Sequence, residues 1–177
     1  MIVLVAGPAG SGKSTLGLHL ARALQLPYLD LDTMTNPVLE ELGVMLPDQL
    51  HWNDPRLRDV VRPARYRALR DTLADQVAAG LGAVVVAPFT AELQGGDEWD
   101  KLVKAAGCVP AVVWVRASPA LLAERRAARA ADRDAHIVDG TGDTPPAVAH
   151  LTVDAALTTA EQVQVVLQHP VVADWPT

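Results

Sequence analysis

One run of nine residues near the start of the chain constrains the fold more than any other feature: Gly7-Pro8-Ala9-Gly10-Ser11-Gly12-Lys13-Ser14-Thr15. It directly follows the apolar run Ile2–Ala6 and leads into Lys13–Leu24, where apolar residues recur with helical spacing. The pattern is G-x-x-x-x-G-K-S between a strand and a helix, which is the context that this motif requires. The sequence therefore predicts a phosphate-binding loop on a strand–loop–helix unit.

The residue types in this loop match the chemistry of a polyphosphate. Glycines let the backbone curl so that successive N–H groups face one point, and the N-terminus of the helix adds its positive end. Lys13 is expected to reach the β- and γ-phosphates, and the Ser14 hydroxyl is expected to ligate Mg²⁺. A dinucleotide site is the alternative, because Asp30 lies about where a ribose-binding acid would, but the glycine spacing does not fit one. We therefore predict ATP and Mg²⁺ as cofactors, held by Gly7, Gly10, Ser11, Gly12, Lys13, Ser14 and Thr15.

Apolar runs alternate with helix-period segments along the chain. The expected strands are Ile2–Ala6, Tyr28–Leu31, Ala83–Ala87, Val109–Val115 and His150–Val153. The expected helices are Lys13–Leu24, Pro63–Ala79, Asp97–Ala106, Pro119–Ala131 and Thr159–Leu167. Strand–helix alternation predicts a three-layer α/β/α fold of the P-loop NTPase type, with a five-stranded parallel sheet and helices on both faces.

Length and composition restrict the class of protein further. The chain has 177 residues, of which half are apolar, so we expect a single domain over residues 1–177. No apolar run approaches the length of a membrane span, no basic leader precedes the first run, and Cys108 is the one cysteine. The formal net charge of −6 argues against nucleic acid as a partner. We expect a cytoplasmic protein, a monomer or a homodimer, that acts on a small molecule.

Two irregular stretches, 33–62 and 132–148, are candidates for functional loops. Arginine gathers close to both: six of the twelve arginines fall within 56–70 and five within 116–133. In a net-acidic chain this clustering indicates local anion sites.

The strand Tyr28–Leu31 is the one expected strand that ends in acidic residues, Asp30 and Asp32. Alternation along a strand predicts that the two carboxylates lie on the same side, near the edge where the phosphates would bind. A P-loop enzyme needs a carboxylate near its magnesium ion. The alternative is that both acids cap a strand end or form a turn.

With the phosphate loop, the Asp30–Asp32 pair and the arginine-rich helix at 118–133 in this order, the chain resembles the small P-loop kinases of the shikimate- and gluconate-kinase type, within the nucleoside monophosphate kinase-like fold. The resemblance implies that Asp30 holds the magnesium shell through water, and that Asp32 binds and aligns the acceptor hydroxyl. It also implies an acceptor-binding region at about 33–70 and an arginine-rich helical lid at about 118–148, whose arginines close over ATP. The glycine triplet of shikimate kinases is replaced here by Ala87-Pro88-Phe89-Thr90-Ala91-Glu92, so the substrate is not implied.

Helical spacing indicates which arginines lie on the same face of a helix. Arg125 and Arg129 fall on one face of the expected helix Pro119–Ala131, and Arg133 repeats the spacing. The resemblance implies that all three bind the polyphosphate and that Arg125 and Arg129 assist catalysis. Arg62 and Arg65 stand near the start of the expected helix Pro63–Ala79, where an arginine suits a carboxylate or phosphate of the acceptor.

Phe89 lies in a loop at the same edge and is expected to line the acceptor pocket. The leading hypothesis is an ATP-dependent phosphotransferase that acts on a hydroxyl of a sugar acid, polyol, hydroxy acid or antibiotic, with Lys13 and Asp32 as catalytic residues. A nucleoside, nucleotide or polynucleotide-end kinase is the second reading. A non-catalytic nucleotide-binding regulatory or toxin-like module is the third.

Overall fold

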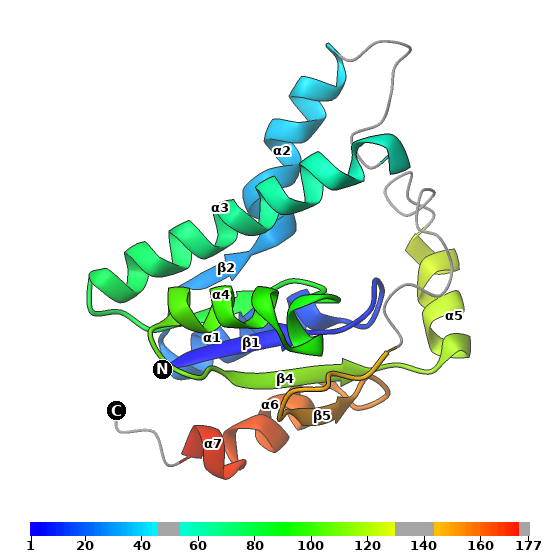
Figure 1. Ribbon diagram of the computed structural model, residues 1–177. Helices are drawn as coiled ribbons and strands as arrows, with labels where there is room; N and C mark the ends of the chain where they lie inside the picture. Colours follow the sequence, from blue (N-terminus) through cyan, green and yellow to red (C-terminus); the bar gives the residue numbers. More distant parts are fainter. Residues whose placement is uncertain (46–53, 130–143, 174–177) are drawn as a thin grey trace.

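The computed structural model describes residues 1–45, 54–129 and 144–173. Within them the chain forms a five-stranded parallel sheet in the order β2-β3-β1-β4-β5 (Figure 1). The strands are β1 (Ile2–Ala6), β2 (Tyr28–Asp30), β3 (Ala83–Val86), β4 (Ala111–Arg116) and β5 (Leu151–Asp154). β1 is central, since Val3 is paired with Val84 on one side and Ala111 on the other. The predicted parallel α/β sheet is confirmed.

The helices are α1 (Lys13–Leu24), α2 (Leu31–Gly43), α3 (Arg58–Ala78), α4 (Asp97–Ala106), α5 (Pro119–Arg129), α6 (Thr159–Leu167) and the short α7 (Pro170–Ala173). Two 3₁₀ turns, Pro55–Leu57 and Glu92–Gln94, complete the described elements. Three helices have the predicted bounds. The capping signals explain this, because Gly107 takes a left-handed conformation after α4, and Thr158 with Glu161 forms a capping box before α6.

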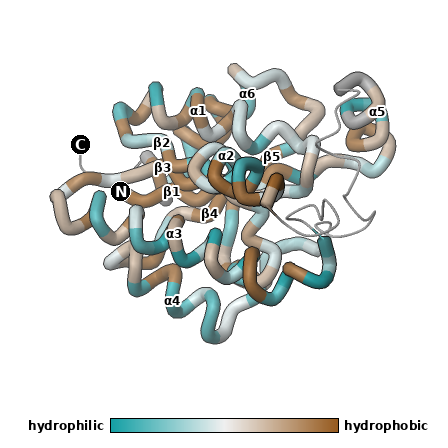
Figure 2. Tube along the Cα trace, turned by 90° about the horizontal axis from the view of Figure 1, so that it is seen from above, coloured by the Kyte–Doolittle hydropathy of each residue, from teal (hydrophilic) through white to brown (hydrophobic). Residues whose placement is uncertain are grey.

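Helices cover both faces of the sheet, so successive residues of a strand enter different cores. Leu4 packs with Leu69, Leu73 and Leu102 of α3 and α4, whereas Val5 packs toward α1 and α6 on the opposite face. Figure 2 shows the strands as a hydrophobic layer between these two groups of helices. This double coverage explains why the strands β1, β3 and β4 read as continuous apolar runs rather than alternating ones.

α1 approaches the sheet closely at Gly17. A Cβ at this position would lie 2.4 Å from Val86 Cγ2 and 3.3 Å from Tyr28 Cε2. The first of these separations is shorter than real Cβ contacts allow, so a larger residue here would push the helix away from β3 and β2. The absence of a side chain at residue 17 thus sets the height of α1 above the sheet.

The expectation of an irregular 33–62 stretch is wrong over its first part, where Leu31–Gly43 forms α2. Asp30 ends β2 and caps this helix: its side chain accepts hydrogen bonds from the backbone N–H groups of Asp32 and Thr33. Pro37 lies inside the helix and suppresses the helical signal in the sequence, because proline removes one intrahelical N–H donor. α3 likewise begins at Arg58 rather than Pro63.

Several smaller boundaries also differ from expectation. β3 ends at Val86 rather than Ala87, and β5 runs over Leu151–Asp154 rather than His150–Val153. β2 ends one residue earlier than predicted, since Asp30 already serves as a helix cap. β4 begins at Ala111 rather than Val109, whose side chain is exposed. α5 is described to Arg129. No helix in the described ranges combines the length and apolar content needed to cross a membrane.

Candidate active site

The nine-residue loop connects the carboxyl end of β1 to the start of α1, and three of its glycines have positive φ. These are Gly7, Gly10 and Gly12, at +150°, +85° and +95°. A Cβ at Gly7 would lie 2.8 Å from the carbonyl oxygen of Val115, so the backbone passes where no side chain fits. The loop therefore has the tight backbone curvature predicted from its sequence.

The residues of this loop fit a bound polyphosphate. Ser11 is buried, and its Oγ is a buried side-chain atom with no hydrogen-bond partner in the described part of the chain. Lys13 is buried, with 9% of its surface exposed, whereas Ser14 and Thr15 at the start of α1 are exposed. An unpaired buried hydroxyl next to a buried lysine and a helix N-terminus suits an anionic ligand that accepts hydrogen bonds.

A magnesium ion would have few protein ligands here. Among residues 1–45, 54–129 and 144–173, no three His, Cys, Asp or Glu side chains are arranged to hold a metal by themselves. Mg²⁺ normally keeps several waters and uses one or two carboxylates together with substrate phosphates. The exposed Ser14 hydroxyl and the Asp30 carboxylate are donors of the right chemistry for such a site.

Asp30 is connected to the phosphate loop through Tyr28. β2 is separated from β1 by β3, so the two strand ends are not neighbours. The Tyr28 hydroxyl nevertheless donates to Asp30 Oδ2 at 2.9 Å and lies 3.2 Å from the carbonyl oxygen of Ser14. Burial, together with the negative charge of Asp30, raises the pKa of Tyr28, so its hydroxyl stays protonated and remains a donor.

Asp32 does not continue the strand, which corrects the alternation argument that placed it beside Asp30. It lies in the first turn of α2, where its Oδ1 accepts a 2.6 Å hydrogen bond from Arg65 Nη2. Arg65 also donates to Thr35 Oγ1 at 2.8 Å and to Asn36 Oδ1 at 2.9 Å. The Asp32 side chain keeps 43% exposure, so its carboxylate still reaches solvent at this edge.

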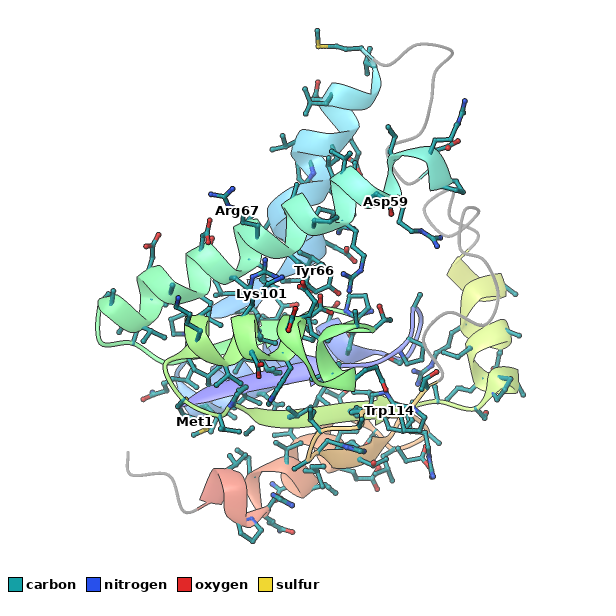
Figure 3. The ribbon with its side chains drawn as sticks, viewed as in Figure 1. Met1, Asp59, Tyr66, Arg67, Lys101 and Trp114 are labelled. Carbon is teal, nitrogen blue, oxygen red and sulfur yellow. The ribbon has the colours of Figure 1, made fainter. Side chains whose placement is uncertain are left out.

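Arg62 lies in the second turn of α3 and pairs with a buried carboxylate. Its Nη2 is 2.9 Å from both carboxylate oxygens of Glu92, a residue with 0% exposure. The guanidinium also stacks over the Tyr66 ring, with Cζ 4.3 Å from the centroid. Tyr66, labelled in Figure 3, is buried between α3 and the sheet, and its hydroxyl accepts a hydrogen bond from the Phe89 N–H at 3.0 Å.

Phe89 is in the loop after β3, as expected, but its side chain is only 1% exposed. The ring meets Tyr66 edge to face, with centroids 6.0 Å apart, and its backbone has φ +50°. The Phe89 ring is thus part of the core that supports the loop. Its expected contact with an acceptor stays a prediction.

A cavity of about 160 Å³ opens between the start of α2, α3 and the loop after β3. Its lining brings the two predicted arginines together with apolar and polar neighbours: Leu31, Arg58, Val61, Arg62, Arg65, Tyr66, Pro88 and Thr90. On the other side of β1, a more open hollow of about 570 Å³ lies between the ends of β4 and β5 and the start of α5.

Arg125 reaches the phosphate loop from α5. Its Nη1 donates to the carbonyl oxygens of Gly10 and Ser11, at 3.3 and 2.9 Å, and its Nη2 donates to Ala155 O at 2.8 Å. The expected contact of Arg125 with a bound polyphosphate stays a prediction. Arg129 ends α5 without a described side chain, and Arg133 lies outside the described residues.

Several residues of this region escaped sequence reasoning. Glu92 stands in an apparent loop and gives no sign of its burial, and Thr35 and Asn36 fall in a helix that the sequence hides. Tyr28 did carry a signal. It precedes Asp30 by two residues on the same strand, so alternation would have placed both side chains on one side.

Comparison with known proteins agrees with this geometry. A family model described as an AAA domain matches residues 2–144, which is most of the chain. The chain belongs to this family. The resemblance of this AAA domain to small P-loop kinases is confirmed, and so is its fold.

Two of the chain's curated relatives are kinases by name. The chain is 33% identical over 94 residues to a cytidylate kinase of Ignicoccus hospitalis, covering 50% of this chain and 52% of that one. It is 33% identical over 91 residues to a shikimate kinase of Rhodococcus erythropolis, covering 51% of each. The AAA domain thus spans about half the length of these curated relatives. A solved Chloroflexus aurantiacus protein, provisionally described as a kinase, aligns over 95% of this chain and 94% of its own, with 26% identity and a TM-score of 0.67.

Proposed function

We propose that this protein is an ATP-dependent phosphotransferase that moves the γ-phosphoryl group of ATP to a hydroxyl of a small molecule. The observation that carries the proposal is the position of the phosphate loop at the end of the central strand, with one hollow at the ends of β2 and β3 and another at the ends of β4 and β5. The cavity on the β2–β3 side has charged and polar walls, as an acceptor site requires. Kinases need two such neighbouring sites, because donor and acceptor must meet at the γ-phosphorus.

The chain's own groups divide the work. Lys13 and the N–H groups of the phosphate loop bind the β- and γ-phosphates, and Ser14 with Asp30 holds the Mg²⁺ that neutralises charge on ATP. Asp32 accepts the proton of the acceptor hydroxyl as the oxygen attacks the γ-phosphorus. The bond from that phosphorus to the β–γ bridging oxygen breaks, and ADP leaves. Arg125, Arg129 and Arg133 stabilise the charge on the transferred group.

The acceptor occupies the cavity beside Asp32 in this proposal. Arg65 bonds to Asp32 directly, and Arg62 is held by Glu92 at the cavity wall. Both arginines are therefore held in fixed positions, and a cavity wall of charged and polar groups suits oxygen-rich acceptors such as sugar acids, polyols or hydroxy acids. Phe89 supports the loop after β3, whose residues Pro88 and Thr90 form the cavity wall facing α3.

ATP consumption with Mg²⁺, measured across a panel of hydroxyl-bearing metabolites, tests the proposal. We expect one acceptor class to stimulate turnover, and Lys13→Ala to reduce the stimulated rate by about 100-fold or more. Lys104→Ala, a surface lysine of α4, is the matched control and keeps the wild-type rate. Asp32→Asn should bind ATP normally and lower kcat by about 10²- to 10⁴-fold.

Two results would contradict the proposal. Tight ATP binding without stimulation by any acceptor would favour a nucleotide-binding module instead. An Asp32→Asn variant with the wild-type transfer rate would remove Asp32 from the chemistry. Cytidine monophosphate belongs in the panel, because the cytidylate kinase relative makes a nucleotide acceptor the second candidate.

A further inference from the structure

The Tyr28 hydroxyl lies between two residues, Asp30 and Ser14, that the proposed function assigns to magnesium binding. It donates to Asp30 Oδ2 at 2.9 Å and is 3.2 Å from the backbone oxygen of Ser14. These two residues belong to different elements, since Asp30 ends β2 and Ser14 lies in the first turn of α1. One phenolic group therefore links the carboxylate to the residue whose hydroxyl is the other expected ligand.

The Asp30 carboxylate is already held on both of its oxygens. Oδ1 accepts the backbone N–H groups of Asp32 at 2.9 Å and Thr33 at 3.1 Å, and Oδ2 accepts the Tyr28 hydroxyl. Asp30 is 6% exposed, so water does not compete strongly for these bonds. Without Tyr28, the carboxylate would be held at Oδ1 alone and could turn about that oxygen.

The ring of Tyr28 is itself fixed in position. It packs against the core formed by α1 and the sheet, and its Cε2 lies directly below Gly17 of α1. Tyr28 thus fixes the end of β2 relative to α1. It does so although β3 separates β2 from the strand that carries the phosphate loop.

We infer that Tyr28 is a positioning residue of the magnesium site, which orients the Asp30 carboxylate relative to Ser14 before the ion binds. Outer residues that orient a metal ligand commonly contribute about 10- to 100-fold to metal affinity. The inference rests on the proposed role of Asp30 as a magnesium residue. It concerns nucleotide binding, so its test does not depend on knowing the acceptor.

The experiment is an isothermal titration of ATP into wild-type protein and Tyr28→Phe over a series of Mg²⁺ concentrations. Tyr28→Phe keeps the ring and removes only the hydroxyl. We expect the Mg²⁺ concentration that half-saturates the gain in ATP affinity to rise about tenfold, with ATP affinity in EDTA unchanged. Tyr66→Phe, which removes the chain's other phenolic hydroxyl, should leave this Mg²⁺ dependence unchanged.

A double-mutant cycle with Asp30→Asn tests separately whether Asp30 binds magnesium and whether Tyr28 acts through Asp30. If Tyr28 acts through Asp30, Tyr28→Phe has no further effect on the Mg²⁺ dependence in the Asp30→Asn background. A wild-type Mg²⁺ dependence for Tyr28→Phe, with or without a lower melting temperature, would overturn the inference and leave Tyr28 a structural strut. If Asp30→Asn alone leaves the Mg²⁺ dependence unchanged, the proposed metal role of Asp30 fails, and the inference fails with it.

Discussion

The phosphate loop depends on the missing side chain of Gly7. In Gly7→Ala the new Cβ would meet the Val115 carbonyl oxygen at 2.8 Å, at a backbone φ of +150° that other residues rarely adopt. We expect a loss of about 1–3 kcal/mol in unfolding free energy and a marked loss of ATP affinity. Denaturant unfolding and an ATP titration measure the two effects.

Gly43→Ala is the matched control for Gly7→Ala. Gly43 is the last residue of α2, and a Cβ there meets nothing within 4 Å. The substitution should change the unfolding free energy by less than about 0.5 kcal/mol or raise it slightly. If both variants lost the same unfolding free energy, the close approach at Gly7 would contribute nothing to stability.

Residue roles were predictable from the sequence where the motif itself carries the geometry. Lys13 and Ser14 follow directly from the loop pattern, and their position at the start of α1 needs no long-range information. The partners of Arg62 and Arg65 were not predictable. Glu92 lies 30 residues from Arg62 along the chain, and Asp32 lies 33 residues from Arg65, so only the packing of α3 brings them together.

At the scale of elements, helices with clear caps had predictable bounds, and α2 did not. Thr158 and Glu161 mark the start of α6 with a reciprocal pair of hydrogen bonds. Asp30 caps α2 through its side chain alone, but it also ends an apolar strand, and Pro37 interrupts the helical pattern. The cap favoured a helix, whereas the strand before it and Pro37 argued against one. The contacts of Thr35 and Asn36 with Arg65, which the sequence does not reveal, stabilise the helix.

The capping box of α6 gives a pH-dependent prediction. Hydrogen bonds from the Thr158 hydroxyl and backbone N–H lower the pKa of Glu161 from its ordinary value. A carboxyl with a lowered folded-state pKa stabilises the fold above its ordinary pKa, and this contribution is lost as pH falls through the lowered value. Glu161→Gln should therefore lower the melting temperature at neutral pH by roughly 1–2 °C, and the difference should vanish in acid.

Melting curves of both proteins from pH 7 to pH 3 measure this effect. Glu124→Gln, an exposed glutamate of α5 that forms no ion pair with any described residue, is the control and should show no such trend. A constant difference between wild type and Glu161→Gln at every pH would contradict the explanation by ionisation.

At the scale of the whole molecule, Arg125 connects segments that are far apart in the chain. It joins α5 to the phosphate loop and to the turn after β5 through three carbonyl oxygens. Lysine cannot reproduce this fork of donors. Arg125→Lys should lower the unfolding free energy by about 1–3 kcal/mol and speed hydrogen exchange in α5.

Arg22→Lys in the exposed last turn of α1 is the control for Arg125→Lys, and it should leave both the unfolding free energy and the exchange of α5 unchanged. Similar behaviour of the two variants would show that Arg125 contributes only charge.

The global architecture was predictable because strands and helices alternate, which restricts the chain to a parallel sheet covered on both faces. The strand order was less accessible. The alternation of strands and helices did not indicate that β3 lies between β2 and β1. Strand order depends on which helices cross which face, and that information is distributed over the whole chain.

The narrow gap beneath Gly17 links three positions that are separated in sequence. Because Val86 and Tyr28 occupy the space that a side chain at residue 17 would need, none of the three can be enlarged without shrinking another. During evolution such positions should change together rather than singly. A homologue with alanine at residue 17 would need a smaller side chain at position 28 or 86 to keep α1 at its present height. The contact between the Tyr28 hydroxyl and Ser14 should therefore be present only where residues 17, 28 and 86 are compatible in size.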